Sequence, residues 1–355
     1  MRLPLPAAVS ISAMLNETLF HNRRVIQLEN SQIRVSVTVE GGHIAEILDK
    51  ATGVSPMWLP PWPSIEISAW SPEKYPEYGN DSESKLLAGI MGHNLCLDMF
   101  GPPSDEEARA GMVAHAEAGV APWVFTDSGS EVSGSCVLPA SQLACTRTLR
   151  LEGRRLRVKE TVENLCALDR PIAWTQHVTL GPPFVANGKT EFRMPGTKSR
   201  GIGETTDFDW PMHPLADGSL RDLRVYADAA SSSSFTTHLM DTEQARAYFF
   251  AWSPESKVAL GYVWNRADFP WVGIWEENRN RSHAPWLGRT QTRGIEFGVS
   301  PFPETRRQML ERGSLFGEPG YRWLPARGTL SAEYYAAITA ADAIPESLDG
   351  FEALL

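Results

Sequence analysis

Several features that would assign this chain to a specialised class are missing from its 355 residues. There are only four cysteines, and no two of them form a C-x-x-C pair, which excludes a disulfide framework and a common zinc or redox motif. We therefore expect reduced thiols at Cys96, Cys136, Cys145 and Cys166. No stretch of 18 apolar residues exists, so we expect no membrane-spanning helix and no membrane partner.

A basic run at either end of the chain is also missing. The formal net charge is -10, and neither end carries a run of lysine and arginine, so nucleic acid is not expected as a partner. Residues 1–15 contain an apolar stretch, but two prolines interrupt it and no clear cleavage site follows. We therefore expect a cytoplasmic protein, with a secretory signal as the alternative.

Long segments of helical periodicity are scarce, whereas turn residues and short alternating runs are abundant. The chain has 26 prolines and 28 glycines. Residues 32–39 alternate between polar and apolar side chains, as in a half-buried strand. Residues 146–158 predict a hairpin around Glu152-Gly153, and residues 248–252 and 258–264 predict another. These patterns indicate a mostly β protein.

Two short helices are predicted beside the strands. Ser104 precedes a predicted helix over residues 105–110, and Glu107 three positions on completes the spacing of a capping box. A second predicted helix, residues 304–312, follows Pro303 and ends at Gly313. No repeat or low-complexity tract marks an internal boundary. We predict an N-terminal extension over residues 1–20 and a single domain over 21–355, folded as a large antiparallel β-sandwich with a few short helices.

A predicted strand around His177 has two unlike faces. By alternation, one face carries small and polar side chains, namely Ala173, Thr175, His177 and Thr179, and the other carries Ile172, Trp174, Gln176, Val178 and Leu180. A shallow polar face with one imidazole suits a ligand cleft. The alternative is a histidine that neighbours satisfy on a solvated face.

Glu296 lies in a similar setting. Ile295 and Phe297 belong to an apolar face, whereas Gly294 and Gly298 flank the carboxylate on its own face and would let a ligand approach. The glycines could instead mark a bulge. Burial would raise the pKa of this carboxyl group, and a raised pKa favours a general base near neutral pH. We expect two distant stretches of chain to place Glu296 and His177 on opposite sides of one pocket.

His115 is the second histidine of interest. If its segment is a strand, His115 and Glu117 share a face, and together with His177 they could imitate a metal site. No further ligand at a telling spacing supports that interpretation, so we predict no metal.

Other residues are candidates for the walls of a sugar site. Aromatic rings pack on the apolar face of a sugar, and among twelve tryptophans we select Trp123 and Trp275. Asp209 could supply a carboxylate to the substrate. A basic cluster, Arg279, Arg281, Arg289 and Arg293, could bind an acidic or phosphorylated sugar, with a solvated loop as the alternative.

The order of these pieces resembles the galactose-mutarotase-like superfamily, which includes the aldose 1-epimerases. The segment from Glu163-Asn164-Leu165 to His177 resembles the strand pair that ends in the family's acid histidine. Residues 114–117, leading to Trp123, resemble the segment of its other active-site histidine, and residues 294–297 resemble the one that carries its base. The resemblance covers the chain from about His21 onward. The chain has no clear counterpart of the arginine-bearing early motif of the aldose epimerases. Ala116-Glu117 replaces the Gly-Gly that commonly follows their first histidine.

The resemblance implies a β-supersandwich with no organic cofactor and a small-molecule sugar as the partner. It further implies a sugar 1-epimerase in which Glu296 is the base, His177 is the acid and His115 polarises the ring-oxygen region. Trp123, Asp209 and Trp275 would complete the substrate site. Two alternatives stay open: a non-catalytic carbohydrate-binding sandwich, and a glycoside hydrolase or lyase that pairs Glu296 with Glu276 or Asp209.

Overall fold

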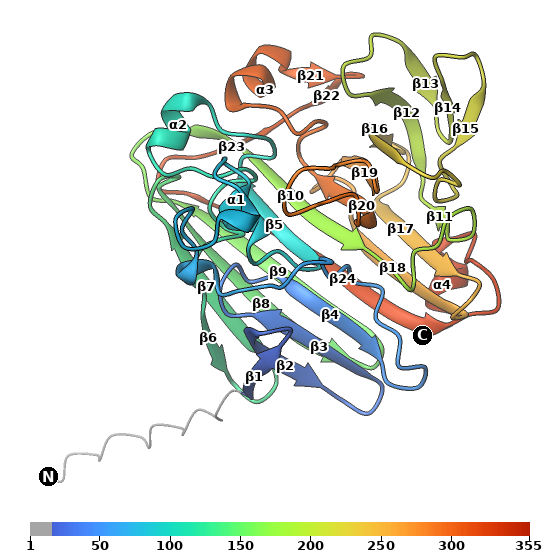
Figure 1. The fold of residues 1–355 in the computed structure, drawn as a ribbon, viewed down its shortest axis with the longest axis horizontal. Helices are drawn as coiled ribbons and strands as arrows, with labels where there is room; N and C mark the ends of the chain where they lie inside the picture. The colour runs from blue at the N-terminus through green and yellow to red at the C-terminus, as the bar shows by residue number, and fades with distance from the viewer. Residues whose placement is uncertain (1–15) are drawn as a thin grey trace, which may run out of the picture.

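Alternating apolar side chains build two large sheets in the computed structural model, which describes residues 16–355 (Figure 1). The larger sheet has twelve strands. From one edge to the other it contains β1 (Glu17–Phe20), β2 (Arg23–Glu29), β3 (Ile33–Thr38), β4 (Ile44–Asp49), β5 (His93–Asp98), β10 (Arg170–Leu180), β20 (Gln291–Gly298), β19 (Trp271–Asn278), β16 (Ser232–Met240), β12 (Gly196–Gly201) and β13 (Asp207–Asp209), with β23 (Arg322–Leu324) paired to the start of β10.

The second sheet has eight strands and packs against the first. Its order is β11 (Glu191–Arg193), β17 (Arg246–Ser253), β18 (Val258–Asn265), β24 (Thr329–Ala340), β9 (Arg155–Asn164), β8 (Leu143–Glu152), β7 (Val132–Leu138) and β6 (Val124–Asp127). Two small ribbons, β14 (Met212–Pro214) with β15 (Leu220–Asp222) and β21 (Ser314–Leu315) with β22 (Glu318–Pro319), complete the strands of the described chain. The predicted mostly β, antiparallel sandwich is confirmed.

Short helices decorate the sheets. They are α1 (Ser84–Leu87), α2 (Asp105–Arg109), α3 (Arg306–Arg312) and α4 (Leu348–Glu352), with the 3-10 turns η1 (Ile67–Ala69) and η2 (Pro76–Tyr78). The capping box predicted at Ser104 is present at α2, and α3 ends at Gly313 as predicted. None of the helices between residues 16 and 355 is long and apolar enough to cross a membrane.

The predicted hairpins are also present. Strand β8 pairs with β9, and their register runs from Leu143 opposite Asn164 to Glu152 opposite Arg155. Strand β17 pairs with β18. Strand β1 lies inside the segment expected as an extension and pairs with β2. Residues 1–15, where the alternative of a secretory signal falls, lie outside the described residues.

The core lies between the two sheets. Phe297 of β20 is fully buried and stacks on Trp264 of β18, with ring centroids 4.3 Å apart. A buried ion pair joins Arg147 of β8 to Glu160 of β9 at 2.8 Å. The Glu160 carboxylate also accepts hydrogen bonds from Trp174 and Gln176 of β10, so the polar residue on the apolar face of β10 is satisfied.

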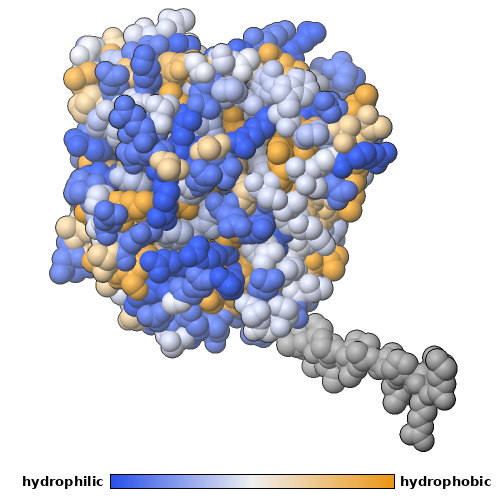
Figure 2. Space-filling model, turned by 180° about the vertical axis from the view of Figure 1, so that it is seen from behind, coloured by the Kyte–Doolittle hydropathy of each residue, from blue (hydrophilic) through white to orange (hydrophobic). Residues whose placement is uncertain are grey.

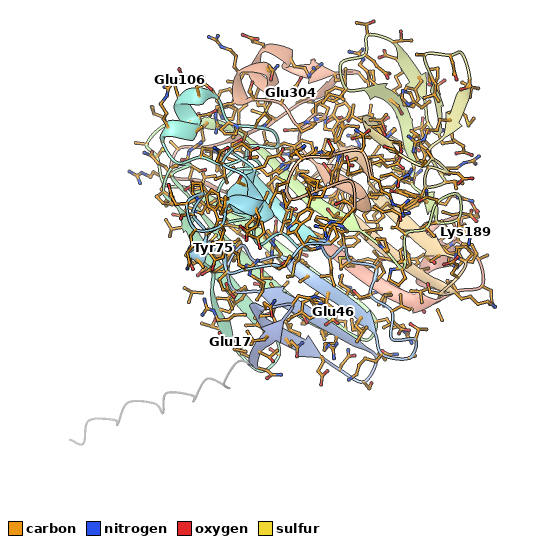
Figure 3. All side chains as sticks on the ribbon, in the orientation of Figure 1. Glu17, Glu46, Tyr75, Glu106, Lys189 and Glu304 are labelled. Atoms are coloured by element: carbon orange, nitrogen blue, oxygen red, sulfur yellow. The ribbon has the colours of Figure 1, made fainter. Side chains whose placement is uncertain are left out.

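Polar and apolar side chains are mixed over the surface. Figure 2 shows apolar residues scattered among polar ones on the rear face. Helices α2 and α3 lie at the same end of the molecule, near Glu106 and Glu304 in Figure 3, and Arg306 of α3 binds Glu107 of α2. All four cysteines are free.

Candidate active site

The pairing of β10 with β20 brings His177 and Glu296 together. The two residues are direct partners in the register of this antiparallel pair, so their side chains leave the same face of the sheet. His177 Nε2 and Glu296 Oε1 are 3.1 Å apart, and the residues are 5% and 2% exposed. The expectation of opposite pocket sides was wrong, because these residues occupy neighbouring strands of one wall.

Two glycines make room for this arrangement. A Cβ atom at Gly294 would lie 2.4 Å from Glu296 Oε1, and a Cβ atom at Gly298 would lie 2.4 Å from Thr175 Oγ1. The ladder between β10 and β20 runs without a register shift from Thr175 to Leu180, so the glycines do not mark a bulge there. Gly294 leaves the space into which the carboxylate of Glu296 folds.

Burial moves both members of the pair toward their neutral forms. Desolvation raises the pKa of the Glu296 carboxyl group well above its ordinary value. Desolvation, and next the nearby His115, lower the pKa of His177 well below its ordinary value. Glu296 Oε1 has no aligned hydrogen bond within residues 16–355, whereas His177 Nδ1 lies 2.9 Å from Thr179 Oγ1. At neutral pH we therefore expect a carboxylic acid beside an uncharged imidazole.

A further buried polar group flanks the pair. Asn94 of β5 is the register partner of His177 on its other side. It is fully buried, and neither its side-chain oxygen nor its nitrogen has a partner in the described part of the chain. Unpaired buried polar atoms call for water or a ligand.

The pair opens into a cavity of about 220 Å³ with mainly apolar walls. The cavity is lined by Trp58, Glu83, Leu86, Leu87, Ile90, Gly101, Pro102, Ala114, His115, His177, Phe235, Trp275, Arg281, Trp286, Glu296 and Pro303. Its volume is below the range that encloses a drug-sized ligand, so a single ring is the fitting occupant. Five of these residues were predicted from the sequence: Glu296, His177, His115, Trp275 and, within the basic cluster, Arg281.

His115 reaches the cavity from a turn, so the condition under which His115 and Glu117 would share a strand face is not met. His115 and Ala116 both adopt left-handed backbone conformations, with φ of 62° and 63°. Such strain in residues other than glycine occurs where surrounding structure imposes it, often at functional sites. His115 Nδ1 donates to Phe100 O at 2.6 Å, and its ring centroid lies 5.1 Å from that of His177. Burial lowers the pKa of His115, which favours the neutral ring whose Nε2 can accept a hydrogen bond.

Tryptophans form one wall of the cavity. Trp275 lies next to His177, with ring centroids 5.9 Å apart, and meets Trp286 edge to face at 6.1 Å. Trp286 also stacks with Trp58 at 6.3 Å. The Trp286 Nε1 donor is buried and has no partner within residues 16–355. These faces suit the apolar side of a sugar ring, and the indole donor suits one of its hydroxyls.

Other predicted residues lie elsewhere. Trp123 is in the core, where its indole donates to Ala118 O and its ring packs with Phe125, so it does not line the cavity. Asp209 is exposed on the terminal strand β13, opposite Lys198. Both assignments to the substrate site are corrected by these positions.

Glu117 and Glu276 are also committed elsewhere. Glu117 caps the backbone N–H groups of Ala140 and Ser141, which removes it from any cluster with His115. No group of three potential metal ligands gathers in the described chain. Glu276 is buried against Arg293 and Arg221, and this leaves neither Glu276 nor Asp209 to pair with Glu296 as a glycosidase would require.

The basic cluster is divided. Arg293 is fully buried beside Glu276, whereas Arg281 lines the cavity. Glu83, Trp58, Trp286 and Phe235 line it as well and were not selected from the sequence. Trp58 and Trp286 carried a weak signal as tryptophans near turns, but no pattern distinguishes Glu83 or Phe235.

Solved structures share this fold over nearly the whole chain. A candidate aldose 1-epimerase from Klebsiella pneumoniae superposes with a TM-score of 0.68 at 12% identity, covering 94% of this chain and 82% of its own. A galactose mutarotase-like protein from Clostridium acetobutylicum superposes with a TM-score of 0.61 at 12% identity, covering 93% of this chain and 99% of its own. One from Lactobacillus casei gives 0.58 at 16% identity, with coverages of 88% and 99%.

No known family profile matches the sequence, and neither does any curated protein. At these identities the superpositions establish the fold. The chain has the galactose-mutarotase-like fold that the order of its motifs predicted.

Proposed function

We propose that this protein interconverts the anomers of a monosaccharide by opening and reclosing its ring. The reaction removes a proton from the hydroxyl group on C1 and delivers one to the ring oxygen. Both oxygens are bonded to the same carbon, so the acid and the base must lie close together. The separation of 3.1 Å between His177 Nε2 and Glu296 Oε1, in the wall of a cavity for one ring, is the observation that carries the proposal.

In this proposal the pair holds one exchangeable proton, and burial, which raises the pKa of Glu296 and lowers that of His177, favours its position on Glu296 at rest. The reactive form arises by transfer of this proton to His177. The Glu296 carboxylate then takes the proton of the anomeric hydroxyl while the His177 imidazolium protonates the ring oxygen, and the bond from C1 to the ring oxygen breaks. This gives an open-chain aldehyde, a neutral imidazole and a carboxylic acid.

Reclosure reverses the two transfers. After rotation about the C1–C2 bond, the hydroxyl group attacks the other face of the aldehyde. His177 takes the proton of that hydroxyl, and the Glu296 carboxylic acid protonates the former carbonyl oxygen. The pair ends with the proton with which it began, so the cycle needs no outside acid or base.

Neighbouring groups hold the sugar in this scheme. His115 accepts a hydrogen bond from a hydroxyl group at Nε2, since its Nδ1 proton is used by Phe100 O. This differs from the role that the resemblance implied, in which His115 polarises the ring-oxygen region. Trp275 and Trp286 pack on the apolar face of the ring. The mutarotase-like and epimerase-like names of the structural neighbours support a sugar as the ligand.

The test is anomer exchange, measured by saturation-transfer NMR over a panel of monosaccharides. We expect Glu296→Gln and His177→Asn each to lower the rate at least about a hundredfold, as for other general acids and bases. His21→Asn, at an exposed histidine with a left-handed backbone that asparagine accepts, is the matched control. Full exchange in Glu296→Gln would overturn the mechanism, and sugar binding without exchange in the natural protein would indicate a binding module.

A further inference from the structure

Glu83 and Arg281 form a charged bridge on the wall of the cavity. Glu83 directly precedes α1, and Arg281 lies in the loop between β19 and β20. Both residues line the cavity, and Arg281 Nη1 donates to Glu83 Oε2 at 3.4 Å. Their side chains are 40% and 30% exposed, so the bridge lies where the cavity meets solvent.

Arg281 is held in place by its surroundings. Its guanidinium lies over the ring of Trp286 at 4.7 Å and over that of Trp275 at 5.6 Å. Its Nε is 3.6 Å from Glu277 Oε2, and Glu277 Oε1 accepts the backbone N–H groups of Asn280 and Arg281. These contacts hold the guanidinium against the tryptophan wall of the cavity.

The charge of Arg281 is already compensated. It faces two carboxylates, Glu83 and Glu277, and no lysine or second arginine from residues 16–355 lines the cavity. The charge of Glu83 also acts on the inner site. Burial and, less strongly, Arg281 lower the pKa of His115, whereas Glu83 raises it. Two carboxylates beside one guanidinium leave a net negative charge at this place, and that charge disfavours the binding of an anion.

We propose that Glu83 selects against anionic sugars, and that the Glu83–Arg281 bridge binds hydroxyl groups remote from C1. This rests on the proposed function and sets aside the acidic or phosphorylated sugars that the arginine cluster suggested. A carboxylate beside a guanidinium offers an acceptor and donors to neighbouring hydroxyls. A phosphate at the same place meets the negative charges of Glu83 and Glu277 in a partly desolvated site, where repulsion is strong.

Binding is the direct test, because it does not depend on turnover. Tryptophan fluorescence, to which Trp275 and Trp286 contribute, is titrated with neutral aldoses and with the phosphate ester of each. We expect the phosphate ester of the best neutral ligand to bind at least about tenfold more weakly. In Glu83→Gln we expect the ratio of the Kd of the ester to the Kd of the neutral sugar to fall at least about threefold. The neutral sugar loses a strong hydrogen-bond acceptor, and the ester is no longer repelled by the charge of Glu83.

Two variants separate charge from structure. Glu83→Asp keeps the charge and should keep the ratio above that of Glu83→Gln. Glu77→Gln removes the same charge from an exposed residue outside the cavity and should leave the ratio unchanged. The Glu83 side chain makes no capping hydrogen bond to α1, so its replacement does not remove a cap.

The outcomes are distinct. A natural protein that binds the phosphate ester as tightly as the neutral sugar, or no neutral sugar at all, would overturn the proposal. So would a Glu83→Gln protein with an unchanged ratio. Anomer exchange measured in parallel reports on the acid–base pair alone, so binding selectivity without exchange would count against the proposed function and leave the selection by Glu83 supported.

Discussion

The position of the Glu296 carboxylate depends on the missing side chain of Gly294. A Cβ atom there would lie 2.4 Å from Glu296 Oε1, and the backbone of Gly294 is not in the left-handed region, so alanine is accepted by the main chain. The steric conflict therefore falls on the carboxylate.

Gly294→Ala is expected to lower kcat/KM for anomer exchange about tenfold to a hundredfold, because a displaced base loses its alignment with the proton. The midpoint of urea unfolding should stay close to that of the natural protein. Gly320→Ala, where the nearest atom to the new Cβ would be 3.4 Å away, is the control. Unchanged kinetics in Gly294→Ala would show that the carboxylate acts from another position.

The shifted pKa values predict the pH profile of exchange. The pKa of His177 is lowered, so the imidazole stays neutral to lower pH, and that of Glu296 is raised, so the carboxyl group stays protonated to higher pH. The one-proton state of the pair therefore spans neutral pH. We expect kcat/KM to be flat through the pH near 6.5 at which a free imidazole titrates, falling only on either side. An acid limb with its midpoint near 6.5 would contradict this.

At the residue scale, the structure brings the predicted His177, Glu296, His115 and Trp275 to one cavity. Parity on strands and motif order carried the signal for the first three, and Trp275 was selected as an aromatic residue. Trp123 and Asp209 were misassigned, since a tryptophan or aspartate near a turn looks the same in a core, on a surface or in a site. Glu83 was missed because its partner Arg281 lies far away in the chain, and pairing across such a distance leaves no local pattern.

Among the elements, β5, β10 and α3 are joined through one carboxylate, and α2 joins them through Arg306 of α3. Asp98, at the end of β5, is fully buried and binds Arg170 of β10 and Arg306 of α3. Arg306 also binds Glu107 of α2 at 2.9 Å. This clamp secures the segments on which Gly101, His115 and Pro303 reach the cavity.

Asp98→Asn is expected to lower the free energy of unfolding by about 2 to 3 kcal/mol, because two arginines lose their shared buried partner while keeping some access to water. Urea unfolding measures the change. Asp209→Asn, at an exposed aspartate, should change stability by less than about 0.5 kcal/mol. A similar loss of unfolding free energy in both variants would contradict a stabilising role of the Asp98 ion pairs.

Elements with their own local signals were predictable. Capped helices and tight hairpins depend on residues a few positions apart, so α2, α3, β8–β9 and β17–β18 followed from the sequence. The turn at His115 could not be predicted, because its two left-handed residues are histidine and alanine, and neither residue type is typical of a turn. Helices α1 and α4 are too short to show a period.

For the whole molecule, the two sheets share one hydrophobic cluster with members from Ile26 to Ile338. Phe297 is central to it, since its ring meets those of Trp264, Phe269, Tyr262 and Tyr334. We propose on this basis that residues 21–355 unfold as a single unit.

Phe297→Ala is expected to cost about 3 to 5 kcal/mol of unfolding free energy, as for other large buried aromatic residues. Calorimetry should show one transition moved to lower temperature. Leu220→Ala, at a leucine that is 61% exposed, should leave the transition in place. Two separate transitions would contradict the single unit.

The architecture was predictable at this scale because alternation and turns recur along the whole chain, and each instance reinforces the same conclusion. At identities of 12% to 16%, the structural neighbours share the fold although few individual residues are the same. Sheet order was not predictable, since it depends on which distant strands meet.

The adjacency of His177 and Glu296 also has a meaning in time. The two residues are more than a hundred positions apart, and β16 and β19 are made between them before β20 can pair with β10. On the proposed mechanism, a nascent or refolding chain gains activity only once this long-range ladder closes, so recovery of activity would date that step of assembly.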